Sequence, residues 1–271
     1  MGMSDDADSR PPLEAAGTTS GTTSGTTGRW RVEVVDESAS TNADVGDRFR
    51  SGEREGLVLA AEHQTAGRGR LGREWVTPAR SSLTVSFLLV PDAAPPERWP
   101  WLPLLTGVAA AAAVRRVTGV QVALKWPNDV LADDHKLGGI LLERIEHDGT
   151  AAAVVGIGIN CHQSRDELPV PEATSLAIVT GGPVDRSALL GALVEELEVR
   201  YDEWVAGADL RAAYLELCTT PGQQVKVAVP GGEVTGEAVD VDEAGRLVVR
   251  TSAGEEHLGA GDVVHVRPEG P

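Results

Sequence analysis

The spacing of apolar residues predicts short strands alternating with helices from Trp30 onward. Apolar runs bounded by turn residues are typical of buried strands, and an alanine-rich run of helical length indicates a long buried helix. A hydroxyl at Ser40 or Thr41 can cap a helix that begins near Asn42. The expected strands are WRVEVVDE, GLVLAAEHQ, SSLTVSFLLV, VQVALKW, GGILLERIE and AAAVVGIGIN. The expected helices are LLTGVAAAAAVRRVTG, RSALLGALVEELEVRYDEWV and LRAAYLELC, so the fold class is α/β or α+β.

The two ends of the chain differ from this middle region. Residues 1–28 contain the repeat GTTSGTTSGTTG, which has no apolar side chains to offset the entropy of ordering its backbone. We expect a disordered tail whose removal leaves folding and activity intact. After Pro221, about five short alternating strands separated by glycine-rich turns predict a small β-barrel over residues 221–271. The pattern alone leaves open whether this barrel only packs on the main domain or binds a partner.

Composition and charge narrow the function classes. The formal net charge of −17 and the pI of about 4.7 argue against a non-specific binder of nucleic acids or anionic membranes. The spacing of Cys161 and Cys218 fits neither a disulfide framework nor a zinc site, which favours a reducing compartment. No apolar run has the length of a membrane span, and the acidic first residues do not form a signal peptide. We therefore expect a cytoplasmic protein.

An arginine- and glycine-rich stretch, QTAGRGRLGREW at residues 64–75, stands out in this acidic chain. A dinucleotide-binding loop relies on bare glycine amides at a helix start, whereas here arginines stand between the glycines. Arg68, Arg70 and Arg73 can offer paired guanidinium donors to phosphate or carboxylate oxygens. The stretch therefore indicates either a flexible loop that closes over an anionic ligand or a solvated basic turn.

Two neighbouring motifs place polar side chains on adjoining turns. KWPNDV begins at residue 125, and its proline ends an expected strand so that Asn128 and Asp129 are presented by a site loop. KLGGILLE then places Lys136 before two glycines, which permit close approach of a ligand to the backbone. A cluster of this kind favours a binding site over a set of isolated surface charges.

A third motif, GIGIN at residues 156–160, puts glycine at every second position of an expected strand. This pattern fits a tight bend or a close helix contact. It fits equally a flat floor under a ring-shaped ligand, with Asn160 ready to hydrogen-bond a base or a phosphate.

Taken in order, these motifs resemble those of the biotin protein ligase family. The resemblance covers about residues 30 to 270. One departure is Leu71, which follows Arg70 at a position where other members often have another basic residue. Without a helix-turn-helix segment that could read DNA, the chain is similar to the ligase-only type. The motifs are STN at 40–42, GRGRLGREW at 67–75, KWPND at 125–129, KLGGIL at 136–141 and GIGIN at 156–160.

The resemblance implies a fold and a two-step reaction. It implies a mixed-sheet catalytic domain flanked by helices over residues 29–220, as in biotin and lipoate ligases, followed by an SH3-like barrel. Biotin would attack the α-phosphate of Mg·ATP to give biotinyl-5′-AMP, and a lysine of a biotin carboxyl carrier domain of an acyl-CoA carboxylase would take the biotinyl group. ATP, biotin and Mg²⁺ are thus expected, with no residue assigned to the metal. The expected protein is a monomer or weak homodimer that binds no nucleic acid.

The same resemblance implies roles for individual residues. Lys136 is expected to bridge the two reacting anions, and Asp129 to orient or deprotonate the acceptor lysine. The catalytic set is Arg70, Lys125, Asp129 and Lys136. The biotin-binding set is Ser40, Thr41, Asn42, Gln64, Gly67, Arg68, Gly69, Arg70, Lys136, Gly139 and Gly156. The ATP-binding set is Arg70, Arg73, Trp75, Asn128, Lys136 and Asn160.

Two alternative functions stay open on the sequence alone. Lipoate or octanoate ligases and transferases share the fold that the resemblance implies. A non-enzymatic regulator could instead use the arginine-rich stretch to bind an anion and the barrel to bind a partner. Release of AMP and pyrophosphate on addition of biotin and ATP distinguishes an enzyme from a regulator.

Overall fold

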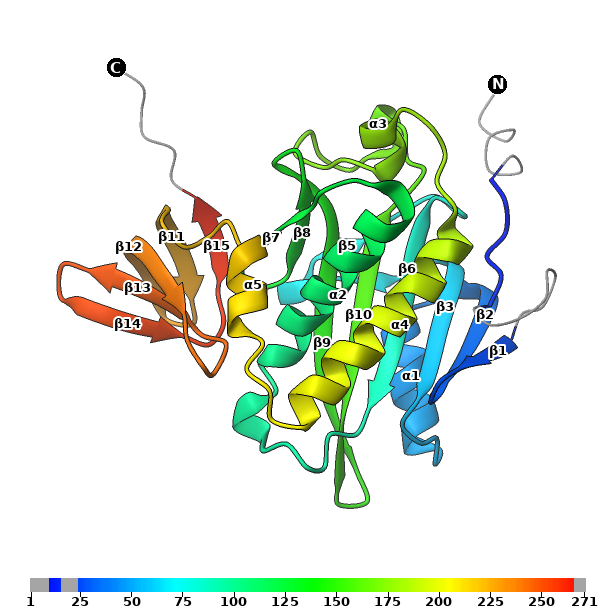
Figure 1. Cartoon of the computed structure of the whole chain (residues 1–271), viewed down its shortest axis with the longest axis horizontal. Helices are drawn as coiled ribbons and strands as arrows, with labels where there is room; N and C mark the ends of the chain where they lie inside the picture. Colours follow the sequence, from blue (N-terminus) through cyan, green and yellow to red (C-terminus); the bar gives the residue numbers. More distant parts are fainter. Residues whose placement is uncertain (1–9, 16–23, 266–271) are drawn as a thin grey trace.

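The centre of the molecule is an eight-stranded mixed sheet. The computed structural model describes residues 10–15 and 24–265. The strand order is β1-β2-β3-β6-β10-β9-β8-β7, in which β2 and β3 are parallel and the other neighbours are antiparallel (Figure 1). The strands are β1 (Ser24–Thr27), β2 (Trp30–Ser38), β3 (Leu57–Gln64), β6 (Ser82–Leu89), β7 (Ala123–Lys125), β8 (Asp129–Ala132), β9 (His135–His147) and β10 (Thr150–Asn160).

Helices cover both faces of this sheet. The long helices α2 (Trp101–Thr118) and α4 (Arg186–Val205) pack on one face, with α5 (Arg211–Leu217) beside them and α1 (Thr41–Arg50) on the opposite face (Figure 1). The short helix α3 (Leu176–Thr180) lies at one end of the sheet. None of the helices within the described ranges is both long enough and apolar enough to cross a membrane.

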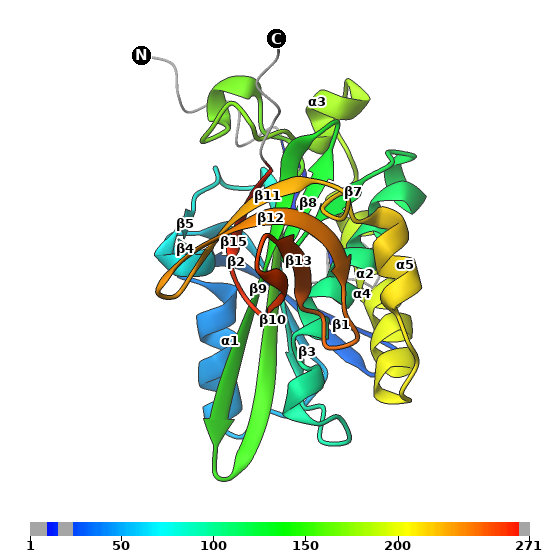
Figure 2. The ribbon, with the colours of Figure 1, turned by 90° about the vertical axis from the view of Figure 1, so that its left-hand side faces the viewer.

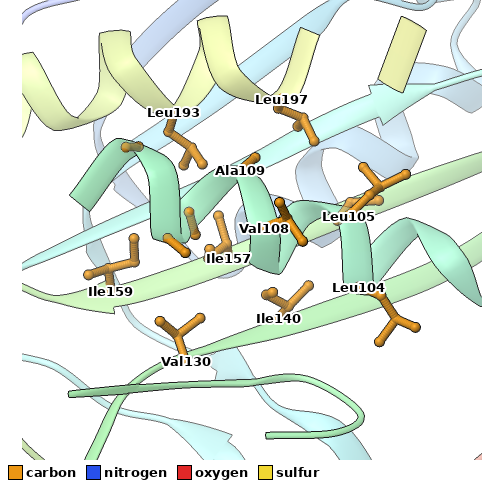
Figure 3. Packing of buried hydrophobic residues seen from close by; sticks show 14 of the residues in the cluster. Leu104, Leu105, Val108, Ala109, Val130, Ile140, Ile157, Ile159, Leu193 and Leu197 are labelled. Atoms are coloured by element: carbon orange, nitrogen blue, oxygen red, sulfur yellow. The ribbon is translucent and has the colours of Figure 1, made fainter. Parts of the chain in front are cut away.

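The alternation of side chains along β6 explains why both faces are covered. Val85 belongs to the main core under α2 and α4, part of which is drawn in Figure 3. Leu88 belongs to a smaller cluster with Val45 and Phe49 of α1. Successive side chains of a strand point to opposite faces, so a strand that is apolar on both faces needs a cover on each.

Most of the predicted elements are confirmed, and α4 has the predicted bounds. The sequence pattern missed β8 and the first residues of β9. Their hairpin turns through Asp133 and Asp134, which have φ of 48° and 61°. Aspartate tolerates the left-handed conformation that such tight turns require. The two short strands and their turn therefore have the sequence pattern of a single polar loop.

The start of α1 is where the hydroxyl pattern predicts it, but the capping bond is absent. Ser40 has the extended conformation of an N-cap residue, and its carbonyl accepts the amide of Asp44 at 3.0 Å. Its side chain makes no capping hydrogen bond, and the hydroxyl instead lies 3.5 Å from Nε of Arg68. Ser40 therefore begins the helix through its backbone and keeps its hydroxyl on the side of the candidate site.

The C-terminal part forms a second, antiparallel sheet of five strands in the order β14-β13-β12-β11-β15. All five strands are labelled in Figure 1, and this part of the molecule faces the viewer in Figure 2. Its packing on the first part includes two tryptophan N–H donors: Trp101 to the carbonyl of Glu243 at 2.6 Å, and Trp126 to that of Gly245 at 3.0 Å. The strands are β11 (Gln224–Val229), β12 (Gly232–Val241), β13 (Leu247–Thr251), β14 (Gly254–Leu258) and β15 (Asp262–His265).

The expectation of a tail without core-forming side chains is wrong for the part that the structure describes. Leu13 and Ala15 are 5% and 3% exposed and belong to the main core. Residues 24–27 form β1, which pairs with β2 at the edge of the sheet. The prediction rests on the side-chain composition of the repeat. A strand at the edge of a sheet, such as β1, needs only backbone hydrogen bonds from the neighbouring strand. Residues 1–9 and 16–23 lie outside the described residues.

Candidate active site

The motifs converge on one cavity of about 120 Å³. It lies where the start of α1, the turn between β7 and β8, and strands β9 and β10 meet the arginine–glycine loop, residues Gly67–Trp75. Most of the site residues that the sequence predicts line this cavity. They are Ser40, Thr41, Asn42, Gln64, Arg68, Gly69, Arg70, Arg73, Trp75, Asn128, Asp129, Lys136, Gly139 and Gly156.

One side of the cavity is a polar wall formed by Ser40, Thr41, Asn42 and Gln64, and buried Ser86 is hydrogen-bonded to two of them. Gln64 at the end of β3 accepts hydrogen bonds from the amide of Thr41 at 2.8 Å and from its hydroxyl at 3.1 Å. The Ser86 hydroxyl lies 2.7 Å from Thr41 Oγ1 and 2.6 Å from Asn42 Oδ1, so its one proton serves either acceptor. The wall is thus assembled by its own hydrogen bonds.

Asn42 connects the polar wall to β9 and β10. Its Nδ2 donates to Glu143 Oε2 at 2.8 Å and to the carbonyl of Leu141 at 3.2 Å. A Cβ on Gly156 would collide with the amide of Asn42, only 3.0 Å from its carbon. Gly156 therefore makes room for a side chain of α1, the close helix contact that the sequence left open.

The floor of the cavity is covered by an indole ring. A Cβ on Gly158 would lie 2.6 Å from two ring carbons of Trp75, and one on Gly139 would lie 3.8 Å from the same ring. Trp75 Nε1 is buried without a hydrogen-bond partner among the described residues. Since a buried donor favours having a partner, this N–H is suited to a polar atom of a ligand.

The arginine–glycine loop is a small hairpin rather than an irregular coil. Its ends, β4 (Gly67–Arg68) and β5 (Glu74–Trp75), pair antiparallel. Its tip passes through Leu71 and Gly72, with φ of 57° and 74°, and Leu71 is 71% exposed. Gly67 has no space for a side chain, because a Cβ there would collide with the backbone carbonyl of Trp75.

Each of the three arginines in this loop has a protein partner. Arg68 forms an ion pair with Glu143 at 3.1 Å, and Arg73 forms one with Asp262 of β15. Arg70 donates to Asn128 Oδ1 at 3.1 Å. Arg68 and Arg73 therefore already pair with carboxylates and Arg70 with a side-chain amide, and a ligand has to compete with these partners.

Lys136 and Asp129 face each other across the β8–β9 hairpin. Lys136 Nζ lies 2.6 Å from Asp129 Oδ1, and the two side chains are 35% and 23% exposed. Burial lowers the pKa of the nearby Arg70 guanidinium. The negative charges of Asp262 and Asp129 act to raise this pKa, and the positive charge of Arg73 acts to lower it further. Arginine stays protonated in proteins despite such a shift, so this corner presents two cations.

Three predicted residues lie outside the cavity. Gly67 lies at the base of the loop. Lys125 lies on β7, and its positive charge lowers the pKa of His265, which burial lowers more strongly. Asn160 is 4% exposed, and its amide donates to the carbonyl of Thr174 and accepts from Gln163, both at 3.0 Å. These contacts give Asn160 a structural task, and its role towards ATP stays a prediction.

Sequence reasoning missed Thr84, Gly158 and Asp262, which line the cavity. It also missed Glu143 and Ser86, which do not line the cavity but hold side chains that do. Thr84 and Ser86 had a usable signal, because polar residues at every second position of an apolar strand indicate a polar face. Asp262 had none, since only the packing of the second sheet brings β15 to the cavity.

No group of three or more His, Cys, Asp or Glu residues in the described ranges is arranged to hold a metal ion. Mg²⁺ in nucleotide sites is held by one or two carboxylates together with the phosphates. A metal that arrives with a nucleotide is compatible with this site, whereas an all-protein metal cage is not.

Comparisons with known proteins agree with this geometry. Residues 32–160 match the biotin/lipoate A/B protein ligase family, and residues 220–266 match the biotin protein ligase C-terminal domain. The chain therefore belongs to the biotin protein ligase family, and the resemblance carried by the five motifs is confirmed.

Three relatives illustrate the match. The biotin–[acetyl-CoA-carboxylase] ligase of Mycobacterium tuberculosis is 39% identical over 271 residues, which is 98% of this chain and 100% of the relative. The corresponding ligase of Paracoccus denitrificans is 33% identical over 76% of this chain and 88% of its own length. The biotin protein ligase of Aquifex aeolicus in complex with biotin and ATP superposes with a TM-score of 0.74 at 29% identity, covering 88% of this chain and 99% of its own.

Proposed function

We propose that this protein activates biotin with ATP to biotinyl-5′-AMP and transfers the biotinyl group to a lysine of a biotin carboxyl carrier domain. One observation carries the proposal: the polar wall and two cations, Arg70 and Lys136, line the same small cavity. The names of the relatives and the biotin and ATP bound in the Aquifex aeolicus structure support it.

In the first step, a carboxylate oxygen of biotin bonds to the α-phosphorus of ATP, and the bond to pyrophosphate breaks. The two anions repel one another as they approach, so fixed cations at the developing charge lower the barrier. Lys136 and Arg70 are suited to this position. The polar wall would bind the ureido group of biotin through donors and acceptors that are already oriented.

In the second step, the amine of the acceptor lysine attacks the carbonyl carbon of the mixed anhydride, and AMP leaves. The amine must first lose a proton, from a pKa of about 10.4 in a free side chain. Asp129 is the carboxylate on the β8–β9 hairpin that lines the cavity, and its present partner is Lys136. Once Lys136 binds the ligand anions, Asp129 can accept a hydrogen bond from the incoming amine.

Mg²⁺ would enter as part of the nucleotide substrate. Glu74 and Asp262 also line the cavity and offer carboxylate oxygens of the kind that Mg²⁺ prefers. Bound to the phosphates, the metal supplies neutralisation of their negative charge. The arginine–glycine loop would exclude water from the anhydride, which hydrolysis would otherwise destroy.

The setting of the enzyme is also part of the proposal. We infer a cytoplasmic protein that acts as a monomer or weak homodimer and binds no nucleic acid. Its net charge of −17 supports the last of these points, because a polyanion repels an acidic protein. A salt-resistant, sequence-selective shift of DNA mobility would contradict this part without touching the ligase activity.

A direct test measures both half-reactions. The full chain, ATP and Mg²⁺ are incubated with biotin or with lipoate, and pyrophosphate release is followed beside the mass of a purified carrier domain. Biotin is expected to release pyrophosphate and to add a biotinyl group to one lysine. Mass gain with lipoate alone would assign the lipoate branch, and no release with either acid would point to a regulator.

A further inference from the structure

The segment Arg10–Ala15, here called the clasp, lies against the sheet and contacts residues that are distant in the sequence (Figure 1). Leu13 and Ala15 are buried in the main core, and the amide of Glu14 donates to the hydroxyl of Ser187 at 2.9 Å. Side chains and backbone of the clasp are therefore both fixed by distant elements.

The clasp adds a hydrogen bond to each member of a buried ion pair. Arg186 at the start of α4 and Glu62 on β3 have side chains that are 2% and 6% exposed, with 2.8 Å between Nη1 and Oε2. The carbonyl of Pro11 accepts from Arg186 at 2.6 Å, and the amide of Leu13 donates to Glu62 at 2.5 Å. A buried ion pair is costly unless its remaining donors and acceptors are satisfied, so the clasp supplies bonds that this pair needs.

The first residue of the clasp binds a residue of the segment that follows β10. Nη2 of Arg10 donates to both carboxylate oxygens of Glu167, at 2.9 and 2.7 Å, and the Arg10 side chain is 9% exposed. Burial alone would raise the pKa of Glu167, but hydrogen bonds from Arg10 and Ser164 outweigh it and lower the pKa below its ordinary value. Glu167 is thus held as a carboxylate.

Glu167 belongs to the segment of residues 161–175, here called the brace, which pairs with the backbone of Lys136. The amide of Lys136 donates to the carbonyl of Glu172 at 2.7 Å, and its carbonyl accepts from the amide of Thr174 at 2.9 Å. Asn160 donates to the carbonyl of Thr174 at 3.0 Å, which fixes the far end of the brace to β10. The brace therefore sets the backbone from which the Lys136 side chain projects.

We propose that the clasp is a positioning element for adenylate formation: Arg10 holds Glu167, and the brace thereby holds Lys136 at the reacting phosphate. This inference rests on the proposed ligase function. It predicts that breaking the Arg10–Glu167 pair displaces Lys136 without removing it, and small displacements of a catalytic group reduce rate steeply.

The test uses the full chain with Arg10→Ala, Glu167→Gln and the exchanged pair Arg10→Glu with Glu167→Arg. Arg29→Ala is the matched control, because Arg29 also forms ion pairs with acidic residues, Glu198 and Asp202 on α4, away from the cavity. Pyrophosphate release is measured over a range of ATP concentrations, and transfer is measured separately from biotinyl-5′-AMP that is added ready-made.

Each single substitution is expected to lower kcat/KM for ATP about 3- to 10-fold, as expected for coupled residues in one network, and to leave transfer within about twofold. The exchanged pair should recover part of the loss, and Arg29→Ala should match the unaltered protein. Thermal unfolding of every variant separates displacement of Lys136 from loss of folded protein.

Three results would overturn the inference: single variants with unaltered ATP dependence, equal losses in both half-reactions, or unfolding of Arg10→Ala and Glu167→Gln. Each would make the clasp a packing element only. An unaltered protein that releases no pyrophosphate with biotin would instead contradict the proposed function, so the two failures are distinguishable.

Discussion

The polar wall and the arginine–glycine loop line the same cavity but are built in opposite ways. Thr41 and Asn42 of the wall are 4% and 6% exposed and are bonded to neighbouring strands. The side chains of Arg68 and Arg73 in the loop are 46% and 58% exposed, and their partners are carboxylates at the rim.

This difference separates a preformed surface from a movable one. Buried hydrogen bonds between short side chains are costly to break, so the wall keeps its shape with or without a ligand. Ion pairs between exposed side chains contribute about 0–1 kcal/mol each. The loop can therefore release its carboxylates for a phosphate at little cost, while recognition of a neutral ring is left to the wall.

The largest expected effect comes from removing the cation between the two regions. Lys136→Ala should slow adenylate formation roughly 10²- to 10³-fold, by analogy with loss of one donor at an oxyanion. Pyrophosphate release in single turnover measures it. Lys226→Ala is the control, because Lys226 also pairs with a glutamate but lies in the second sheet. A loss below tenfold would mean that Arg70 carries the phosphate charge instead.

Asp129→Asn should affect the second step more than the first. Transfer is expected to fall about 10²-fold, the lower end for loss of a general base, while adenylate still forms. Acceptor labelling measured beside pyrophosphate release checks this. Equal loss of both steps would assign the carboxylate to positioning Lys136, with which it is paired at 2.6 Å.

Gly156→Ala tests whether the wall is rigid. The added methyl group would collide with the amide of buried Asn42, and overpacking of this kind costs about 1–3 kcal/mol of unfolding free energy. Biotin affinity should fall as well, because Asn42 belongs to the wall. Urea unfolding and calorimetry of biotin binding measure the two effects. Gly182→Ala is the control, since nothing lies within 4 Å of a Cβ there. If both variants were equally stable, the wall would have moved to accept the methyl group and would not be rigid.

Arg68→Ala gives the smallest effect and tests whether the loop is movable. Losing the pair with Glu143 should raise the rate of limited proteolysis within Gly67–Trp75 about two- to fivefold, in line with the modest strength of exposed pairs. Added salt should do the same to the unaltered protein. Arg250→Ala, which breaks exposed pairs of the second sheet, is the control. Biotinyl-5′-AMP should protect the loop, and unchanged cleavage in all cases would make it rigid.

The amino-acid sequence by itself determined the order of most elements and most of the residues that line the cavity. Apolar periodicity reflects which face of a helix or strand is buried, so α4 and the central strands could be predicted from local pattern. The motifs identified the family because glycines, arginines and the lysine stand at fixed intervals along the chain. Pairings such as Gly67 with Trp75 follow from a hairpin and are also local.

Tertiary structure decided which of these residues act on a ligand and which act on one another. Gly156 makes room for Asn42, Asn160 holds the brace, and Asp262 reaches the cavity from the second sheet. Tertiary packing also decided the burial of Leu13, because the N-terminal segment in which it lies has few other apolar residues. Such contacts join residues far apart in the chain, and local sequence carries no record of them because the partner is chosen by packing in three dimensions.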